Sequence, residues 1–306
     1  MDFSFLTKHL AQKYARRSRR FKGKGAEVQQ IFNDKGLYFL PRDVYCSLPS
    51  VKEIESSFEY QGEGLPWHDP ALFDRDRLLA FLKELEPFAR EFDPPREGHF
   101  DQPERFYWDN GFFGGADALT YYSILRRYQP ARVLEIGSGF STLLAAEALK
   151  RNGRGDVVCI EPYPRAFLKN MRLKELIQKP AQDMTADWFN DHLQDGDVLF
   201  IDSTHTVKTG GDCLYLYLKI LPQLKAKVFI HSHDIFLPEA MPKEWQLKNH
   251  WYFNEQYLLY ALLLGNANFE VLYGTNYHRR VNPEAFAAYN GSKSKPEGGS
   301  FWYRRV

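Results

Sequence analysis

The chain has 306 residues, of which 44% are hydrophobic, 26% are charged and 16% are aromatic. This composition is typical of a folded protein with one large domain, or one domain with a substantial cap. The formal net charge is +1, so no overall field draws the chain to nucleic acid. No apolar run is long enough to span a bilayer, and the N-terminus lacks a signal-peptide core. We therefore expect a cytoplasmic protein with no nucleic-acid partner and no membrane span.

The first third of the chain is predicted to be an extension. Residues 8–25 are basic and indicate a solvated arm, with a contact to a membrane surface or a polyanion as the alternative. Residues 71–92 predict an amphipathic helix because apolar side chains recur at helical spacing: Leu72, Leu79, Leu82, Leu85 and Phe88. We expect a mostly helical cap over residues 1–110 and a catalytic domain over residues 111–306.

Strands and helices alternate after residue 110. Helices are predicted over residues 116–128, 141–151 and 253–266, the second capped by Ser141 or Thr142. Buried strands are predicted over residues 131–136, 157–162, 197–202 and 227–234, with a weak strand near 176–182. The last two strands, 269–275 and 300–306, flank a polar loop and indicate an antiparallel pair. This alternation predicts an α/β fold with a largely parallel sheet.

The stretch LEIGSGFST (134–142) joins a strand end, a glycine turn and a helix start. Gly137 and Gly139 allow a sharp turn and a close approach to a ligand. The helix N-terminus behind them offers free N–H groups and a positive dipole end. Glu161 ends the next strand, where a carboxylate accepts both hydroxyls of a ribose. Together these features predict a nucleotide-type cofactor site; the alternative is a tight turn beside a surface glutamate.

The glycine turn does not match the dinucleotide fingerprint, which requires a third glycine where this chain has Thr142. A dehydrogenase is therefore disfavoured. The run VLEIGSGFST instead resembles the first motif of class I S-adenosylmethionine (SAM)-dependent methyltransferases. In that fold the glycine turn meets the methionine part of SAM and an acid after the second strand holds the ribose. The resemblance implies a cofactor-binding set of Glu135, Gly137, Gly139, Glu161 and Asp183, the last of these near the adenine unless it is simply an exposed turn residue.

The resemblance extends from about Tyr107 to the C-terminus, through YWDNGFFGGADALTYYSILRRYQPARVLEIGSGFST, DVLFIDSTHTVKTGGD and HSHDIFLPEAMPKEW. These runs are similar to a bacterial methyltransferase branch related to cephalosporin hydroxylase-like and macrolide-sugar O-methyltransferase proteins. The resemblance implies a Rossmann-like seven-stranded sheet of order 3-2-1-4-5-7-6, with the last strand antiparallel. The first hundred residues carry no comparable motif.

Two apolar runs, FIDSTHT (200–206) and VFIHSHDIF (228–236), end in aspartate and histidine. Charged groups are rarely buried without partners, and ligands of a parallel sheet bind beyond the carboxyl ends of its strands. We therefore expect one acceptor site to collect five side chains: Asp202, His205, His231, His233 and Asp234. His231 lies within the apolar run, so a satisfied core histidine is the alternative for that residue.

Methyl transfer needs a nucleophile whose proton is removed, and a histidine with an ordinary pKa of about 6.5 suits that task. In the related macrolide-sugar enzymes an aspartate after strand 4 and an acidic pair after strand 5 hold magnesium, and the catalytic histidine follows the aspartate by three residues. The resemblance thus implies His205 as the general base beside Asp202. It also implies Asp202, His233 and Asp234 as metal ligands. Because an imidazole replaces one acid, we expect a softer divalent ion than magnesium, or a weakly held one.

These observations predict a SAM-dependent methyltransferase that acts on oxygen of a small molecule or sugar. A non-haem metal oxygenase on the same fold and a non-catalytic SAM-binding protein are the alternatives. The sequence leaves open the acceptor, methylation on nitrogen rather than oxygen, and a homo-oligomeric state. It also leaves two readings for several other residues: Glu255 faces the site or solvent, Asp212 caps a helix or contacts substrate, and Trp245, Trp251 and Phe253 form an aromatic wall or ordinary packing.

Overall fold

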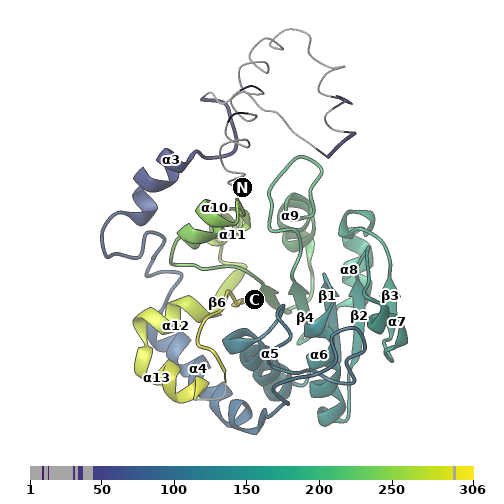
Figure 1. Cartoon of the computed structure of the whole chain (residues 1–306). Coiled ribbons are helices and arrows are strands. Elements are labelled where there is room, and N and C mark those ends of the chain that lie inside the picture. The colour runs from purple at the N-terminus through teal and green to yellow at the C-terminus, as the bar shows by residue number, and fades with distance from the viewer. Residues whose placement is uncertain (1–8, 10–12, 14–29, 32–33, 37–43, 292–293) are drawn as a thin grey trace, which may run out of the picture. The chain divides into compact units, whose positions relative to one another are not determined.

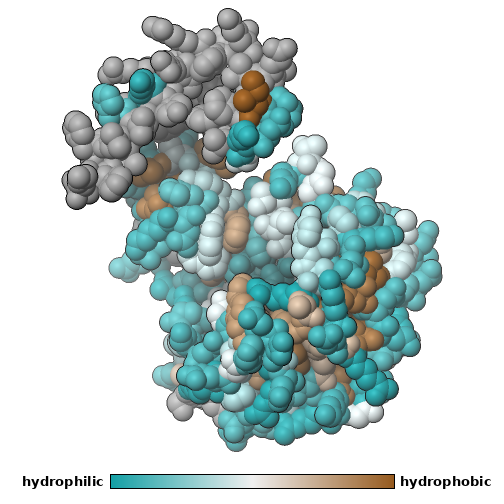
Figure 2. Space-filling view, turned by 45° about the vertical axis from the view of Figure 1, so that its right-hand side comes forward, coloured by the Kyte–Doolittle hydropathy of each residue, from teal (hydrophilic) through white to brown (hydrophobic). Residues whose placement is uncertain are grey.

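The computed structural model describes residues 9, 13, 30–31, 34–36, 44–291 and 294–306 (Figure 1). The basic arm predicted over residues 8–25 lies almost entirely outside them. Two compact units are present, Met1–Ser50 and Val51–Val306, and the second one holds the sheet. The surface seen in Figure 2 is largely hydrophilic, with small separate apolar patches. Among the described residues, no helix combines the length and apolar character that crossing a membrane requires.

The sheet has seven strands in the order β3-β2-β1-β4-β5-β7-β6, as predicted. Strands β1 to β5 are mutually parallel where they pair, and β7 runs antiparallel to both β5 and β6. The strands are β1 (Arg132–Ile136), β2 (Asp156–Ile160), β3 (Glu175–Ile177), β4 (Val198–Ile201), β5 (Phe229–Ser232), β6 (Phe269–Gly274) and β7 (Phe301–Arg305).

Helices cover both faces of the sheet (Figure 1). They are α3 (Val51–Ser56), α4 (Arg75–Glu91), α5 (Gly115–Tyr128), α6 (Phe140–Asn152), α7 (Ala166–Asn170), α8 (Ala186–His192), α9 (Asp212–Tyr215), α10 (Lys243–Lys248), α11 (Glu255–Leu263), α12 (Thr275–Val281) and α13 (Pro283–Asn290). A π-helical turn (Leu216–Ile220) and a 3-10 turn (Leu221–Gln223) extend α9, and 3-10 turns also form at Phe58–Tyr60 and Ala181–Asp183.

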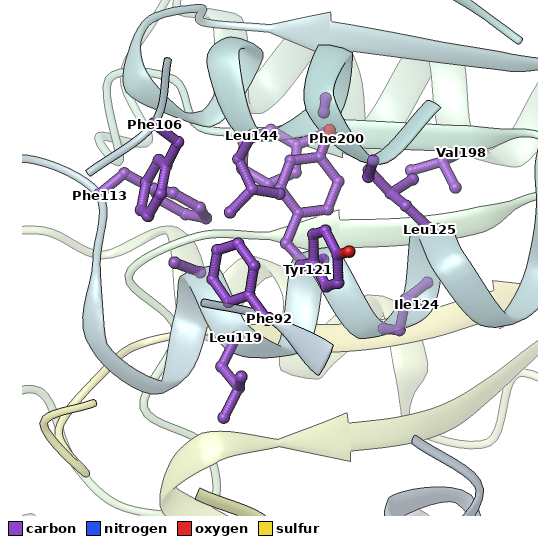
Figure 3. Packing of buried hydrophobic residues seen from close by; sticks show 14 of the residues in the cluster. Phe92, Phe106, Phe113, Leu119, Tyr121, Ile124, Leu125, Leu144, Val198 and Phe200 are labelled. Carbon is purple, nitrogen blue, oxygen red and sulfur yellow. The ribbon is translucent and has the colours of Figure 1, made fainter. Parts of the chain in front are cut away.

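The strands are buried on both sides, which explains their nearly continuous apolar sequences. Successive side chains of a strand point to opposite faces, so Val133 and Leu134 of β1 belong to two different core clusters. The first cluster joins the sheet to α4, α5 and α6, and Tyr121 of α5 stacks on Phe200 of β4 within it (Figure 3). The second cluster joins the other face to α8, α9 and α11.

The helix predicted over residues 71–92 forms as α4, but it begins later. The Asp74 side chain accepts a hydrogen bond from the Arg77 N–H at 2.9 Å and so caps the helix. Its buried stripe consists of Leu78, Phe81, Leu82, Leu85 and Ala89. Leu79 and Phe88, predicted on that stripe, are only half-buried.

The start of α6 also differs from the prediction. Gly139 occupies the N-cap position, and the N–H of Gly139 donates to the Thr142 hydroxyl oxygen at 3.0 Å. Ser141 and Thr142 therefore lie inside the first turn of the helix instead of capping it. A second difference is that α12 and α13, which were not predicted, fill the connection between β6 and β7.

The segment before residue 110 contributes to the main core. Helix α4 packs against α5 and α13, and residues 51–110 belong to the same compact unit as the sheet. The division into a cap over residues 1–110 and a catalytic domain over residues 111–306 stays a prediction.

Candidate active site

The glycine turn after β1 lies against the loop that follows β4. Gly137 has a positive φ of 78°, and a Cβ atom placed on it would lie 1.7 Å from the backbone oxygen of Asp202. The Gly137 N–H also donates to the oxygen of Ile160 at the end of β2, at 3.0 Å. Both the backbone conformation and the lack of space therefore require glycine here. The turn and Asp202 occupy the same edge of the sheet.

Gly139, two residues later, is different. Its φ is −177°, outside the left-handed region, and a Cβ atom placed on it would meet nothing within 4 Å beyond its own chain neighbours. Open space therefore lies in front of the N-terminus of α6, where the free N–H groups of the helix begin. The free N–H groups suit the carboxylate of a cofactor, and the open space suits its uncharged chain.

Glu161 borders the same turn. Its carboxylate accepts hydrogen bonds from the N–H groups of Ser138, at 3.2 Å, and Tyr163, at 2.7 Å. Glu161 is half-buried, so part of the carboxylate faces solvent beside the turn. This places the predicted ribose-binding acid next to the glycine turn. Asp183 lies in the 3-10 turn after β3 and is exposed.

Glu135 supports the turn from the interior. Its side chain is fully buried, and it accepts hydrogen bonds from the Tyr121 hydroxyl, at 2.9 Å, and from the Thr142 hydroxyl. Burial raises the pKa of Glu135 to about 7, although the hydrogen bonds from Thr142 and Tyr121 oppose the rise. Because Thr142 also accepts from Gly139, Glu135 is linked to the turn through Thr142.

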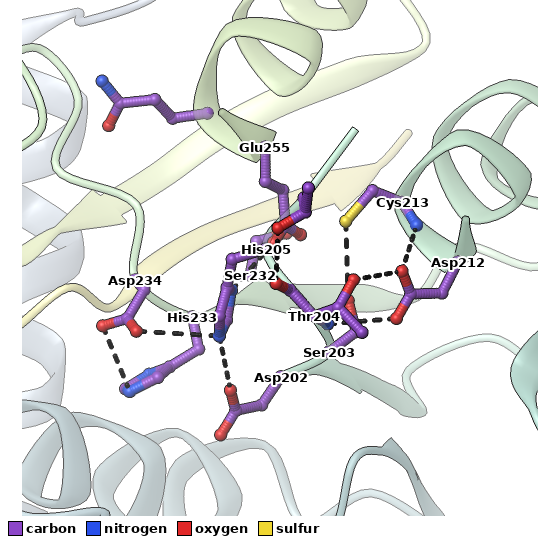
Figure 4. A network of polar contacts seen from close by, with 12 residues as sticks. Asp202, Ser203, Thr204, His205, Asp212, Cys213, Ser232, His233, Asp234 and Glu255 are labelled. Atoms are coloured by element: carbon purple, nitrogen blue, oxygen red, sulfur yellow. Dashed lines mark hydrogen bonds and ion pairs between the residues drawn. The ribbon is translucent and has the colours of Figure 1, made fainter. Parts of the chain in front are cut away.

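His205 lies in the loop after β4, with both ring nitrogens facing carboxylates (Figure 4). Its Nδ1 is 2.9 Å from Oε2 of Glu255, and its Nε2 is 3.2 Å from Oδ1 of Asp202. Asp234, after β5, brings Oδ2 to 3.6 Å from the same Nε2. His205 is buried, and its φ of 56° is in the left-handed region, which is uncommon for residues other than glycine.

Two sets of contacts hold the His205 loop. The N–H of Asn254, before α11, donates to the His205 carbonyl oxygen at 3.0 Å. Asp212, at the start of α9, accepts from the Thr204 N–H at 3.0 Å and from the Thr204 hydroxyl at 2.6 Å. Asp212 is therefore a brace for the loop, while Gly211 is the N-cap residue of α9.

Glu255 faces the site rather than solvent. It is the first residue of α11, it is 2% exposed, and its Oε1 accepts a hydrogen bond from the Tyr217 hydroxyl at 2.6 Å. The sequence analysis left this orientation open because an acid in the first turn of a helix is also common on surfaces. Its position after the loop of residues 236–254 was the one available signal.

His233 and Asp234, at the end of β5, join Asp202, His205 and Glu255 in one acid–imidazole cluster. The Nε2 of His233 is 3.7 Å from Oδ1 of Asp234, and its Nδ1 is 3.9 Å from Oδ2 of Asp117 in α5. Asp234 therefore lies between the imidazoles of His205 and His233, whose ring centroids are 6.5 Å apart. The sequence analysis missed Asp117, which it treated only as part of a helix.

His231 takes a different place from the other predicted residues. Its side chain is fully buried, its Nε2 is 2.8 Å from the Ser300 hydroxyl oxygen, and its ring stacks on Phe200 at 4.2 Å. Burial and the nearby His233 lower its pKa well below the usual range. His231 therefore makes the contacts expected of a core histidine, whereas Asp202, His205, His233 and Asp234 lie together.

The cluster is an arrangement of paired charges. Burial lowers the pKa of His205, but hydrogen bonds with Asp202 and Glu255 outweigh it and hold that pKa well above 6.5. Burial also opposes the charge on His233, yet Asp202, Asp234 and Asp117 raise its pKa. For Asp202, the two imidazoles overcome the effect of burial and lower its pKa to about 2. Both imidazoles are thus stabilised in their protonated form in the resting site.

The predicted metal ligands do not form a metal-binding arrangement. Within the part of the chain that the structure describes, no group of three or more His, Cys, Asp or Glu side chains is arranged to hold a metal ion. Asp202 and Asp234 face the Nε2 atom of His205 instead. These residues therefore do not fit a resident metal ion as they stand.

Aromatic side chains border the cluster on the side of α10. The ring of Phe253 lies 4.9 Å from the ring of His205. Trp251 is nearly parallel to Phe253 at 5.8 Å, and Trp245 contacts Trp251 edge-on at 5.3 Å. Trp251 is 45% exposed, so one end of this aromatic wall is open to solvent.

Comparison with known proteins assigns the class. Residues 134–235 match a family model described as a methyltransferase domain, a range that runs from the glycine turn to the end of the acidic cluster. An uncharacterized protein from Archaeoglobus fulgidus is 30% identical over 169 residues, which are 53% of this chain and 76% of that protein. The matched motifs and the sheet order agree, so the chain belongs to the class I SAM-dependent methyltransferases.

Solved structures with a similar chain course include two methyltransferases. An SAH-bound methyltransferase from Podospora anserina is 19% identical, with 80% of this chain and 98% of that chain covered and a TM-score of 0.43. An O-methyltransferase from Bacillus cereus in complex with SAH is 15% identical, with 78% and 98% covered and a TM-score of 0.41.

Proposed function

We propose that this chain transfers the SAM methyl group to a hydroxyl oxygen of a small molecule or sugar, with His205 as the general base. The observation that carries the proposal is the contact between Gly137 and Asp202, because it brings the glycine turn and the acid–imidazole cluster to one edge of the sheet. A methyl donor at the turn and an acceptor at the cluster would then be neighbours, as in-line transfer requires.

The residues around the turn fit SAM. The open space at Gly139 offers room for the methionine part, and the free part of the Glu161 carboxylate offers acceptors for ribose hydroxyls. Bound SAM supplies an electrophilic methyl group on a sulfonium. Glu135 keeps the turn in shape from the interior, and Asp183 is proposed to meet the adenine from the end of β3.

His205 handles the proton at Nε2. Glu255 accepts from Nδ1 and so fixes the ring, which leaves Nε2 directed to Asp202 and Asp234. An acceptor hydroxyl placed there would donate its proton to Nε2 as the oxygen attacks the methyl group. Since nearby carboxylates raise the pKa of His205, the neutral form required of a base becomes more populated as pH rises. We therefore expect methyl transfer to increase with pH through the neutral range.

Asp202 and Asp234 orient the acceptor hydroxyl, and the aromatic wall packs against its carbon skeleton. An exposed tryptophan beside a phenylalanine suits the flat face of a sugar or an aromatic ring. No step of this mechanism is assigned to a divalent ion, because the side chains predicted to hold one, Asp202, His233 and Asp234, pair with His205 and with one another instead. The cytoplasmic location and a homo-oligomeric state stay predictions.

The proposal is tested by a transfer screen with methyl-labelled SAM against panels of sugars, phenols and other hydroxylated metabolites. Label on oxygen that disappears in the His205→Gln variant is the expected result. Label on nitrogen alone, or iron-dependent hydroxylation without label transfer, would replace the proposal with another reaction.

A further inference from the structure

Asp117 is a buried carboxylate that the mechanism above does not use. It lies in the first turn of α5 and is 4% exposed. Its carboxylate accepts hydrogen bonds from the N–H groups of Gly299, at 2.8 Å, and Ser300, at 3.0 Å, and from the Thr275 hydroxyl, at 3.0 Å. Two of these three donors belong to the segment that leads into β7. Asp117 thus binds the C-terminal part of the chain to α5.

The segment 295–300 is held by its backbone on several sides. Its carbonyl groups accept hydrogen bonds from α5, from the chain after β5 and from α12. The four pairs are the Ala116 N–H with Lys295, the Asn276 side chain with Gly298, the Ile235 N–H with Gly299, and the Thr275 N–H with Ser300, at 2.9–3.0 Å. The segment therefore crosses the edge of the sheet where β5 ends.

The segment touches the acceptor site at Gly299. A Cβ atom placed on Gly299 would lie 2.7 Å from Cα and 3.1 Å from the backbone nitrogen of Asp234. Asp234 has a φ of 53°, in the left-handed region, which an aspartate adopts more readily than most residues other than glycine. The backbone of Gly299 is the neighbour that packs directly against it. Gly298 is equally close to Asp117, because a Cβ there would lie 2.1 Å from Oδ1.

We propose that Asp117 is a positioning residue for the acceptor site: by holding Gly299 and Ser300 it keeps segment 295–300 against Asp234 and so fixes Asp234 between the two imidazoles. Asp117 also faces the Nδ1 atom of His233 at 3.9 Å, and no hydrogen-bond partner of that atom is present among the described residues. Asp117 thus faces His233 directly and acts on Asp234 through Gly299. The inference rests on the proposed function, since it assigns Asp234 to the acceptor.

The test compares two substitutions that each remove one hydrogen bond from the same carboxylate. In Asp117→Asn the amide nitrogen replaces Oδ2 and cannot accept the Gly299 N–H, whereas Oδ1 still accepts from Ser300 and Thr275. Thr275→Val removes the Thr275 hydroxyl, which donates to Asp117 and also lies 3.3 Å from the Tyr273 hydroxyl. We expect Asp117→Asn to lower kcat by about tenfold with unchanged SAM affinity, and Thr275→Val to lower it by less than about threefold. Equal effects of the two variants would reduce Asp117 to a structural tether and overturn the proposal.

A double-mutant cycle separates positioning from general stability. If Asp117 acts through Asp234, Asp117→Asn lowers kcat no further once Asp234→Asn is present. Additive losses in the cycle, or a wild-type rate in Asp234→Asn, would overturn the proposal. Should Asp117→Asn fail to fold by circular dichroism, Gly299→Ala takes its place, because the added methyl group displaces Asp234 directly.

A structural readout distinguishes failure of this inference from failure of the proposed function. If the wild-type protein methylates no acceptor, crystal structures of the wild-type protein and Asp117→Asn still report the backbone of Asp234. A φ that leaves the left-handed region in the variant supports the inference. An unmoved Asp234 rejects it.

Discussion

The Nδ1 atom of His205 lies 2.9 Å from Oε2 of Glu255, although the two residues are 50 positions apart. The other oxygen of Glu255 accepts the Tyr217 hydroxyl, so the carboxylate itself is held in place. A histidine backed by an oriented carboxylate presents its second nitrogen in a defined direction, which is the arrangement that a general base requires. Glu255 therefore belongs to the site through its contact with His205.

The first prediction concerns this pair. His205→Gln should lower kcat by about 100-fold or more, because no other group takes the acceptor proton, while SAM affinity should not change. Glu255→Gln should lower kcat by less, about tenfold, because the amide keeps an oxygen but loses the charge that stabilises the ring of His205. Initial rates and calorimetric titration with SAM measure both effects. His99→Gln, in an exposed loop, is the control, and a wild-type rate in His205→Gln would assign the base elsewhere.

The second prediction compares the two glycines of the turn. Gly137→Ala should destabilise the fold by more than about 2 kcal/mol, because a positive φ is unfavourable for alanine and its Cβ would overlap the backbone oxygen of Asp202. Gly139→Ala should unfold like the wild-type protein, since its φ of −177° is outside the left-handed region and its Cβ meets open space, yet bind SAM about tenfold more weakly. Chemical denaturation and SAM titration separate the two effects. Wild-type SAM affinity in Gly139→Ala would mean that the open space is not the cofactor's.

The third prediction ranks the two acids assigned to the cofactor. Glu161→Gln should weaken SAM binding by about tenfold, because a neutral amide is a poorer acceptor for two ribose hydroxyls. Asp183→Asn should weaken it by less than about threefold, because Asp183 is exposed and open to solvent. The measurement is the SAM dissociation constant at constant ionic strength. The reverse order would exchange the roles of the two acids.

The fourth prediction is a pH dependence of stability from His278 in α12. Burial lowers the pKa of His278 to about 3, and its Nε2 atom has no hydrogen-bond partner among the described residues. In the unfolded chain the pKa is about 6.5. Below that pH the unfolded state binds a proton at His278 that the folded state does not bind. The contribution of His278 to the free energy of unfolding is therefore fully present above pH 6.5 and falls as the pH drops toward 3.

At pH 5 the titration of His278 should lower the free energy of unfolding by about 2 kcal/mol relative to pH 8. Urea unfolding of the wild-type protein and of His278→Gln at the two pH values checks it. The free-energy difference between the two proteins should shrink or reverse at pH 5, because glutamine does not titrate. Parallel pH dependences of the two proteins would show that His278 is protonated in the folded state.

The fifth prediction concerns metal ions. Because Asp202 and Asp234 are paired with His205, a cation would first have to displace these contacts. We expect the rate of methyl transfer to be unchanged after dialysis against a chelator. Elemental analysis of the untreated protein and rates with added magnesium, manganese or iron complete the measurement. A rate that falls on chelation and returns with one of these ions would restore the metal-ligand assignment of Asp202, His233 and Asp234.

Local patterns in the sequence predicted most of the sheet. Strands such as Val198–Ile201 are apolar on both faces, and their alternation with helices leaves few topologies. The same reasoning failed at α12, where Thr275, Asn276, Tyr277 and His278 are all buried. A helix that buries polar side chains shows no apolar stripe, so its sequence carries no helical periodicity.

The amino-acid sequence by itself determined the glycine turn and the convergence of Asp202, His205, His233 and Asp234, because each depends on residue types at short spacing or at strand ends. The order of the strands followed from the family resemblance. Only the tertiary structure decided that Glu255 and Asp117 join them and that His231 bonds Ser300 instead. His205 and Glu255 are 50 positions apart, Asp117 and its partner Gly299 are 182 apart, and His231 and Ser300 are 69 apart. Side chains so distant along the chain meet only when the packing of α5, α11 and β7 on the sheet sets their positions, and no short-range pattern records that packing.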